Sequence, residues 1–305
     1  WSLRRIISPS SNVVQINGTS LLKTKLLAEG GYAYVHLATD ANNNTYALKR
    51  MLALDDDAVA CANTEAELLR KFSHHPGFVT CLGTSAKTHK RKSNRASGPY
   101  KEFYMLLEYC PNGSLVDLLY SRAKDGSFAR RPPLELSRVL DVFEMVVSSV
   151  AHMHKHGWAH RDLKLENVLA TAEGRYVLCD FGSATNARYP GIGSCRKQAT
   201  VMQEERISKY STLMYRAPEM CDLHRGHVID ERVDVWALGC ILFSLCFREH
   251  PFSAESTLSI LNAAYRIPAA SRFPPSVHAL IRALLAADPT ERPTADAILG
   301  CVRTL

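Results

Sequence analysis

The periodicity of the apolar residues changes once along this 305-residue chain, near Asn112-Gly113. Before that point, short runs of β-branched and aromatic residues alternate with turn residues, a pattern that is typical of strands. After it, apolar residues such as Val139, Phe143 and Val146 recur every three or four positions, which indicates helices. The pattern predicts an α+β chain with two lobes: a small, mostly antiparallel sheet with one helix, and then a larger, mainly helical lobe.

Four segments follow from this pattern. We expect a flanking extension over residues 1–20, a first lobe over 21–107, a connector over 108–111 and a second lobe over 112–305. The expected strands of the first lobe are Lys25–Leu27, Tyr34–Thr39, Tyr46–Met51, Phe78–Gly83 and Phe103–Leu107, with a hairpin turn at Asn42–Asn44. The expected helices are Ala58–Phe72, a helix through Val139–Met153, Val235–Phe247, Thr257–Ala264 and Val277–Leu285.

The formal net charge of +7 is concentrated in one segment. Lys87–Lys101 holds six basic residues and no acid, which leaves +1 for the rest of the chain, without a basic helix or an aromatic-interleaved strip. We therefore expect no nucleic-acid partner. The segment itself is expected to be a solvated surface loop, and the alternative is a docking patch for acidic partners or lipid.

The apolar runs and the cysteines exclude further classes. The longest apolar run, Val235–Phe247, is shorter than the roughly 18–20 residues that a membrane helix needs. The nine cysteines include no Cys-x-x-Cys pair, and their odd number favours a reduced, intracellular protein over a disulfide framework or a zinc site. The chain begins with Trp1 rather than methionine, so we expect its start to be trimmed.

Three charged motifs occur in a fixed order in the second lobe. His160-Arg161-Asp162-Leu-Lys164-Leu-Glu-Asn167 comes first, Asp180-Phe181-Gly182 begins 18 residues after Asp162, and Ala217-Pro218-Glu219 begins 37 residues after Asp180. Upstream, Tyr46-Ala47-Leu48-Lys49 lies on an expected strand behind a glycine-containing turn. Any one of these triplets arises easily by chance, but their order and context together do not.

With these motifs the sequence resembles the eukaryotic protein kinase superfamily over roughly Leu21–Val302. Within it, the chain is most similar to the Numb-associated kinase family, which includes the adaptor-associated and cyclin-G-associated kinases. The segments that carry this similarity are Leu27–Ala33, Val177–Thr185, Lys209–Met220 and Asp234–Cys240. The resemblance implies a bilobal protein kinase fold and the use of ATP and Mg²⁺.

The resemblance also implies roles for charged residues of the first lobe. Lys49 would hold the α- and β-phosphates, and a carboxylate from the helix of this lobe would pair with it. Glu65 is the candidate because Leu68 and Leu69 follow it at +3 and +4, as in kinases. Glu67 is the alternative, although it faces roughly the other side of a helix.

The second lobe would supply the catalytic and metal-binding residues. Asp162 would accept the proton of the substrate hydroxyl or orient that hydroxyl, and Lys164 would steady the γ-phosphate as in serine/threonine kinases. Asn167 and Asp180 would bind Mg²⁺ because that ion prefers carboxylate, amide and phosphate oxygens.

Both lobes would contribute to the nucleotide site. Val35 and Ala47 would cover one face of adenine and Leu169 the other, with Leu107 at the rear and backbone groups offered by Glu108–Cys110. The phosphate-binding loop would comprise Leu27, Ala28, Gly30, Gly31 and Ala33.

This loop departs from the family pattern. Alanines 28 and 33 replace its first and third glycines, and alanine restricts the close backbone approach and positive φ that glycine permits. Because Numb-associated kinases are similar here, the interpretation is a variant loop rather than an inactive one.

Other matching residues are expected to hold the scaffold together. His160 and Phe181 would stack in an apolar column, Asp234 would bind the backbone near His160-Arg161, and Glu219 would pair with Arg292. In the segment Asp180–Glu219, Thr212 would bond Asp162 and Lys164, and a helix is expected over Glu204–Lys209. A phosphate elsewhere on this segment would pair with Arg161.

The resemblance favours an active serine/threonine kinase in clathrin-linked traffic. It implies a threonine of an adaptor medium subunit as substrate, a cytoplasmic location at coated membranes, and a monomer without a membrane span. Two alternatives stay open: a nucleotide-binding pseudokinase scaffold, and a kinase of the related myristoylated and palmitoylated branch that binds membranes peripherally through lipid.

Overall fold

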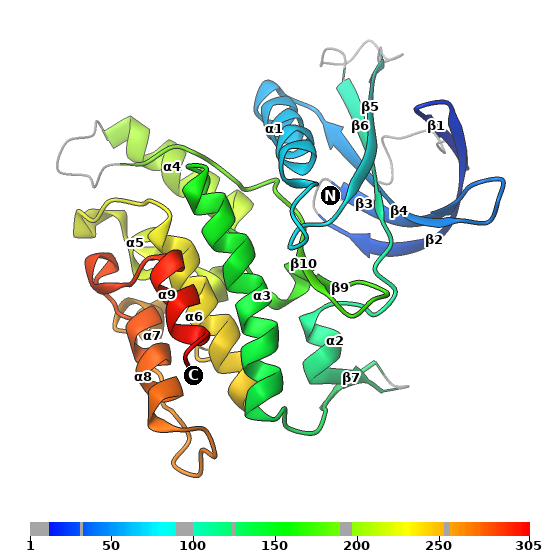
Figure 1. Ribbon diagram of the computed structural model, residues 1–305. Coiled ribbons are helices and arrows are strands. Elements are labelled where there is room, and N and C mark those ends of the chain that lie inside the picture. Colours follow the sequence, from blue (N-terminus) through cyan, green and yellow to red (C-terminus); the bar gives the residue numbers. More distant parts are fainter. Residues whose placement is uncertain (1–11, 31–32, 90–99, 124–125, 190–196, 253–256) are drawn as a thin grey trace. The chain divides into compact units, whose positions relative to one another are not determined.

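A computed structural model describes residues 12–30, 33–89, 100–123, 126–189, 197–252 and 257–305. The chain forms two compact units, the first made of Trp1–His74 and Val79–Cys110, the second of His75–Phe78 and Pro111–Leu305. The first unit carries an antiparallel sheet and the helix α1, and the second is mainly helical, so the predicted α+β class is confirmed (Figure 1). No helix in these described ranges is long and apolar enough to cross a membrane.

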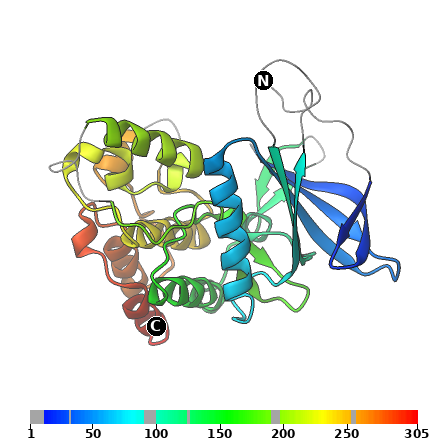
Figure 2. The same ribbon diagram turned by 90° about the horizontal axis from the view of Figure 1, so that it is seen from above.

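The first unit is built on an antiparallel six-stranded sheet in the order β1-β2-β3-β4-β6-β5. Figure 2 shows α1 at one side of this sheet and the pair β1–β2 at its far edge. Its strands are β1 (Val13–Ile16), β2 (Thr19–Glu29), β3 (Ala33–Thr39), β4 (Thr45–Ala53), β5 (Cys81–His89) and β6 (Tyr100–Glu108).

The expected extension over residues 1–20 is wrong for its described part. β1 and the start of β2 belong to the sheet, joined by a two-residue turn in which Asn17 and Gly18 have φ of 51° and 81°. Positive φ at both turn positions is the type I′ geometry that Asn-Gly favours in hairpins. Val14 and Ile16 are buried in the core of this unit, so the segment is part of the fold.

The two faces of the sheet carry different sets of residues. Alternate residues point to opposite faces, and directly paired residues share a face. One face buries Ala38, Leu48 and Leu106 in the core that β1 completes. The opposite face therefore presents Val35, which pairs with Lys49 across β3 and β4.

Helix α1 (Asp56–Phe72) packs against this second face of the sheet, mainly against β4. Its N-terminus is capped by Asp55, whose side chain accepts a 2.7 Å hydrogen bond from the N–H of Ala58. The helix begins two residues before the predicted Ala58 because acidic residues fill its first turn, where they favour the helix dipole. Its buried side chains recur at helical spacing: Ala62, Glu65, Ala66, Leu68, Leu69 and Phe72.

The predicted strand Phe78–Gly83 is wrong at its start. β5 begins at Cys81, whereas Phe78 forms a parallel bridge with Leu178 in the second unit. The anchor is Gly77, whose carbonyl accepts hydrogen bonds from the Ser149 hydroxyl (3.0 Å) and the N–H of Leu178 (2.8 Å). A side chain at Gly77 would meet Ser149, so this contact requires glycine.

The basic segment Lys87–Lys101 is only partly the predicted loop. Its ends are strand: β5 continues to His89, and β6 begins at Tyr100. Lys87 pairs with Glu102 across these strands, which places opposite charges side by side. Residues 90–99 lie outside the described part.

The second unit is organised around α3 (Leu136–Lys155) and α6 (Arg232–Phe247), which lie side by side with α9 (Ala295–Val302) (Figure 1). α6 is buried on all sides, as predicted for its apolar run. The remaining helices are α2 (Leu115–Leu119), α4 (Lys197–Tyr210), α5 (Pro218–Cys221), α7 (Thr257–Leu261) and α8 (Pro275–Leu284). Two small hairpins complete the unit: β7 (Tyr120–Arg122) with β8 (Phe128–Arg130), and β9 (Val168–Ala170) with β10 (Tyr176–Leu178).

Candidate active site

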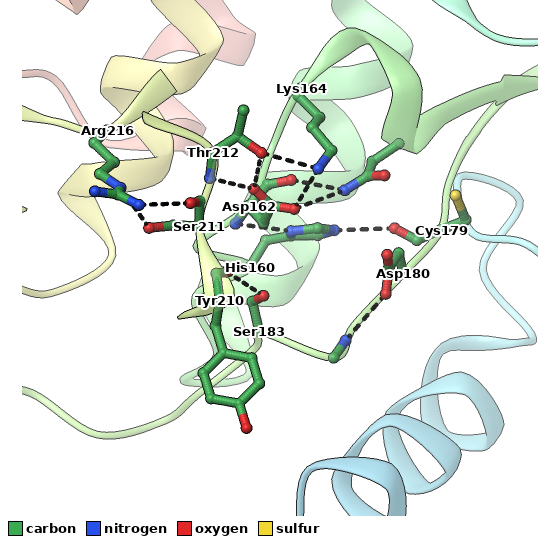
Figure 3. A network of polar contacts seen from close by, with 12 residues as sticks. His160, Asp162, Lys164, Cys179, Asp180, Ser183, Tyr210, Ser211, Thr212 and Arg216 are labelled. Atoms are coloured by element: carbon green, nitrogen blue, oxygen red, sulfur yellow. Dashed lines mark hydrogen bonds and ion pairs between the residues drawn. The ribbon is translucent and has the colours of Figure 1, made fainter. Parts of the chain in front are cut away.

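Asp162 lies at the centre of a network of charged hydrogen bonds in the second unit (Figure 3). Its Oδ1 accepts hydrogen bonds from the N–H of Thr212 (2.9 Å) and from the Thr212 hydroxyl (2.8 Å). Its Oδ2 accepts one from the Lys164 ammonium at 2.7 Å. The two oxygens are therefore held by groups from two separate segments, which fixes the direction of the carboxylate.

Lys164 and Asn167 complete this network. The Lys164 ammonium also donates to the Thr212 hydroxyl at 2.9 Å, so the three side chains form a closed triangle (Figure 3). Asn167 lies in the 3₁₀ turn that follows, and its Nδ2 donates to the carbonyl of Asp162 at 2.8 Å. The predicted contacts of Thr212 with Asp162 and Lys164 are confirmed.

Asp234, in the first turn of α6, holds the backbone that precedes Asp162. Its carboxylate accepts hydrogen bonds from the N–H groups of His160 (2.7 Å) and Arg161 (2.8 Å), which confirms the prediction. Its Oδ2 also lies 2.9 Å from Nε2 of His154 on α3. Burial alone would raise the pKa of Asp234, but the hydrogen bond and charge of His154 outweigh burial and lower it.

Two non-glycine residues beside the catalytic motifs have left-handed backbones, Arg161 with φ of 67° and Asp180 with φ of 64°. This conformation costs roughly 1–2 kcal/mol for a residue with a side chain. At Arg161 the bond to Asp234 offsets that cost. At Asp180 the neighbouring Cys179 is fixed on both sides: its N–H donates to the carbonyl of Asn167, and its own carbonyl contacts His160 Nε2 at 3.1 Å.

Phe181 and His160 lie in one apolar stack, as predicted. Phe181 is fully buried, with its ring centroid 5.6 Å from that of His160 and 5.8 Å from that of Phe78. The stack fixes the residue next to Asp180, so the position of that carboxylate depends on packing as well as on hydrogen bonds.

In the first unit, the partner of Lys49 is Glu65. Nζ of Lys49 on β4 lies 2.6 Å from Oε1 of Glu65 on α1, and both side chains are buried. The alternative partner, Glu67, is exposed on the other side of the helix. The candidate partner Glu65 is therefore in contact with Lys49, and a buried pair of this kind is costly to break on one side.

The residues expected around the nucleotide are divided between the units. In the first unit, Val35 pairs with Lys49 and Ala47 with Leu107, so these four residues share the sheet face that α1 borders. Leu169 lies on β9 of the second unit, paired with Val177. The role of these residues in binding the nucleotide stays a prediction.

The connector residues lie at the end of β6. Leu107 is buried, and the N–H of Glu108 donates to the carbonyl of Thr80 at 3.0 Å. The carboxylate of Glu108 accepts the N–H of Thr80 in return, at 2.7 Å. This reciprocal pair fixes the strand end that leads into Cys110, where the first unit ends.

The variant loop between β2 and β3 does not require glycine at positions 28 and 33, because neither position has a positive φ. Ala28 pairs with Val35 within the β2–β3 ladder, and Ala33 begins β3. Neither alanine has a positive φ, and the turn closes with a 2.8 Å hydrogen bond from the N–H of Gly30 to the carbonyl of Ala33. Leu27 is an exposed residue of β2, and Gly31 lies outside the described residues.

Asn167 and Asp180 are chemically suited to hold Mg²⁺. The Asn167 amide nitrogen is engaged with the Asp162 carbonyl, which turns the amide oxygen away from that contact. Together with the carboxylate of Asp180 this supplies the hard oxygen donors that Mg²⁺ prefers. No cluster of three or more His, Cys, Asp or Glu side chains suited to a metal occurs among the described residues, so the donor set depends on an amide and on phosphate oxygens.

The segment between Asp180 and Glu219 contains helix α4, which confirms the helix predicted over Glu204–Lys209. The helix is longer than predicted, because it begins at Lys197. The Ser183 hydroxyl donates to the carbonyl of Tyr210 at 2.5 Å, which joins the start of the segment to the last residue of α4 (Figure 3). Ser194 of this segment lies outside the described residues. Helix α4 ends at Tyr210, two residues before Thr212.

Sequence reasoning missed two residues that support this site. Arg216 donates from Nε to the Ser211 hydroxyl and from Nη2 to the Ser211 carbonyl, both at 2.9 Å, which fixes the residue before Thr212 (Figure 3). Its position directly before Ala217-Pro218-Glu219 was the available signal. His154, which contacts Asp234, carried no local signal because its partner is 80 residues away.

The predicted ion pair of Glu219 with Arg292 is confirmed. Arg292 Nη1 and Nη2 lie 2.7 and 2.8 Å from the two carboxylate oxygens, and both side chains are almost completely buried. The pair joins α5 to the turn before α9 and so anchors the C-terminal end of the segment that carries Thr212.

Comparisons with known proteins agree with this geometry. Residues 21–301 match the protein kinase domain family. A probable serine/threonine-protein kinase of Dictyostelium discoideum is 41% identical over 291 residues, which is 94% of this chain and 34% of that protein. A second one from the same organism is 37% identical, over 92% of this chain and 24% of its own length.

The serine/threonine-protein kinase ppk30 of Schizosaccharomyces pombe is 32% identical over 93% of this chain and 28% of its own length. The chain thus spans about a third or less of the length of these relatives. The matched region contains most of both units and every motif described above. The chain therefore belongs to the protein kinase domain family.

Proposed function

We propose that the protein is an active serine/threonine kinase of the Numb-associated kind. The observation that carries this proposal is the carboxylate of Asp162, held by Thr212 and Lys164 within 2.9 Å. Lys164 two residues after the catalytic aspartate is a feature of serine/threonine kinases, and here its ammonium is already in place. A scaffold without chemistry would have no need of this closed network.

The residues of the network have separate tasks in phosphoryl transfer. Asp162 orients the hydroxyl of the substrate and accepts its proton as the oxygen attacks the γ-phosphate. Lys164 neutralises charge on the transferred group, and Thr212 holds the carboxylate in the direction that the hydroxyl must approach. Transfer of this kind depends mainly on positioning and charge stabilisation, which is what the network provides.

Nucleotide binding falls to Lys49 and to the two oxygen donors. Lys49, oriented by Glu65, binds the α- and β-phosphates. Asn167 and Asp180 would hold Mg²⁺, and the ion would supply positive charge against the phosphates. The variant loop fits this activity, because Ala28 and Ala33 have ordinary strand conformations and therefore no backbone strain. This favours a working loop over the pseudokinase alternative.

The proposed substrate is a threonine of a clathrin adaptor medium subunit, phosphorylated in the cytoplasm at coated membranes by a monomeric kinase. The support is the similarity to Numb-associated kinases in four segments, together with helix α4, which ends two residues before Thr212. A lipid-anchored kinase of the myristoylated and palmitoylated branch is the second candidate, since it shares the same loop and second-lobe features.

The test is transfer of labelled γ-phosphate from Mg-ATP to a threonine peptide of an adaptor medium subunit, beside a generic basic protein. Asp162→Asn should reduce transfer by about 10²–10⁴-fold with ATP binding retained. Asp141→Asn, an exposed aspartate of α3, is the matched control and should transfer normally.

Preference for the peptide supports the adaptor-kinase assignment. Labelling of the basic protein alone would remove the proposed substrate and keep the mechanism. Binding of nucleotide without any transfer would identify a scaffold.

A further inference from the structure

Arg161 carries a buried charge that the mechanism above does not use. Its side chain is largely enclosed, and Nη2 of its guanidinium is buried without a hydrogen-bond partner among the described residues. A buried guanidinium normally has all its N–H groups paired, because an unpaired buried donor is costly. Some other contact must therefore hold this side chain.

That contact is the ring of Tyr189. Cζ of Arg161 lies 4.8 Å from the centroid of the Tyr189 ring, within the range of a cation–π interaction. Such interactions strengthen as the two groups are withdrawn from water, and both residues here are partly buried. Burial lowers the pKa of Arg161. Tyr189 and Asp234 oppose that shift, and the positive charge of Arg206 on α4 adds to it. The ring thus favours a cation that burial and Arg206 destabilise.

Tyr189 and Arg161 are both fixed to the start of α6. The N–H and carbonyl of Tyr189 form a two-way bridge with Ile229, at 3.0 and 2.9 Å. Arg188 strengthens this bridge through an ion pair with Glu231 at 2.8 Å. Five residues after Ile229, Asp234 binds the backbone of Arg161 at 2.8 Å. The backbones of Tyr189 and Arg161 are therefore both bonded to the stretch Ile229–Asp234, which leads into the first turn of α6.

We propose that Tyr189 is a positioning residue of the kinase reaction: its ring holds Arg161, and through it Asp162, so that no phosphate on the segment is needed for activity. The inference rests on the proposed kinase function. It replaces the sequence-based expectation that a phosphate pairs with Arg161. The left-handed backbone of Arg161, directly before Asp162, explains why loss of the ring would be felt at the catalytic carboxylate.

The experiment compares Tyr189→Leu, which keeps apolar bulk without a π face, with Tyr189→Phe, which keeps the ring. The matched control is Tyr176, whose ring lies 5.4 Å from Cζ of Arg138, between β10 and α3 and outside the active-site network. All proteins are treated with phosphatase, and kcat, the KM for ATP and Tm are measured.

We expect Tyr189→Leu to lower kcat about tenfold and to change the KM for ATP by less than about twofold. Tyr189→Phe should retain at least about half of the wild-type kcat. Tyr176→Leu should lower Tm without lowering the kcat of the folded protein. Phosphatase treatment should leave the wild-type kcat unchanged.

The proposal is overturned if Tyr189→Leu keeps the wild-type kcat, if Phe fails as badly as Leu, or if phosphatase abolishes wild-type activity. An inactive wild type would refute the proposed function instead. In that case a double-mutant cycle of Tyr189→Leu with Arg161→Met still decides the contact: non-additive shifts of Tm support it, and additive shifts overturn it.

Discussion

The ion pair of Glu219 and Arg292 provides a direct measure of what burial does to a charge pair. The five N–H groups of Arg292 are all engaged: two with the Glu219 carboxylate, and three with the carbonyls of Arg232, Ala286 and Ala287. Its guanidinium also lies against the ring of Trp236, with 5.1 Å from Cζ to the ring centroid. The two side chains are almost completely removed from solvent, so bulk water does not reach the pair.

Glu219→Gln keeps the size of the side chain but removes its charge. One amide oxygen still accepts a hydrogen bond, while the amide nitrogen faces an Arg292 N–H and repels it. Breaking one side of a buried pair costs about 3–5 kcal/mol, which for a chain of this size lowers Tm by roughly 6–10 °C. Arg292→Met should cost more still, because it also removes the three hydrogen bonds to the carbonyls of Arg232, Ala286 and Ala287.

The matched control is Glu144→Gln. Glu144 pairs with Arg303 at the same 2.7 Å, but the side chains are 39% and 58% exposed, against 1% and 0% for Glu219 and Arg292. An exposed pair contributes about 0–1 kcal/mol, so Tm should change by no more than about 2 °C. Thermal unfolding, monitored by circular dichroism, measures the change in Tm for both variants. Equal shifts for the two variants would refute the argument that burial sets the cost.

Three further predictions follow. Thr212→Val removes the hydroxyl between Asp162 and Lys164 and should lower kcat about 10- to 100-fold, whereas Thr212→Ser retains the hydroxyl. Equal kcat values for the two variants would refute the positioning role. Burial lowers the pKa of His250 to about 4, so below pH 6.5 the unfolded state binds a proton that the fold excludes. Denaturant unfolding should therefore lose about 3 kcal/mol between pH 6.5 and pH 4, a loss that should be absent in His250→Asn. Gly239→Ala should lower Tm because its methyl would lie 2.7 Å from Leu285, whereas Gly300→Ala, with open space, should raise Tm; the opposite order would contradict the packing.

The motifs predicted the site because their spacing along the chain reflects contacts that are local or directly adjacent. Asp162, Lys164 and Asn167 lie within six residues, and a single turn brings them together. Thr212 was assigned by its motif, since nothing in its own neighbourhood points to a residue 50 positions away. The first-lobe pair also required the family pattern, because helical spacing alone left Glu67 open beside Glu65.

The errors of the sequence analysis lie where tertiary contacts override local pattern. The residues Asn17-Gly18 carried a hairpin signal, but the short strand before them has too few apolar residues to stand out. Phe78 has the composition of a strand, yet Gly77 binds Ser149, 72 residues further along the chain, and Phe78 pairs with Leu178 instead of joining β5. Such long-range contacts leave no periodic trace in the sequence.

The catalytic loop shows how a fold can impose a conformation that its own residues disfavour. Arg161 and Asp180 both have left-handed backbones, and both adjoin groups that the reaction uses. Neither conformation follows from local sequence, because each is stabilised by elements far along the chain: Asp234 on α6 for Arg161, and the Asn167 carbonyl with the Phe181 stack for Asp180. The strain therefore persists only while the second unit is fully packed. It follows that substitutions which loosen α6 should impair phosphoryl transfer before they unfold the chain, because the strained residues are the first to relax.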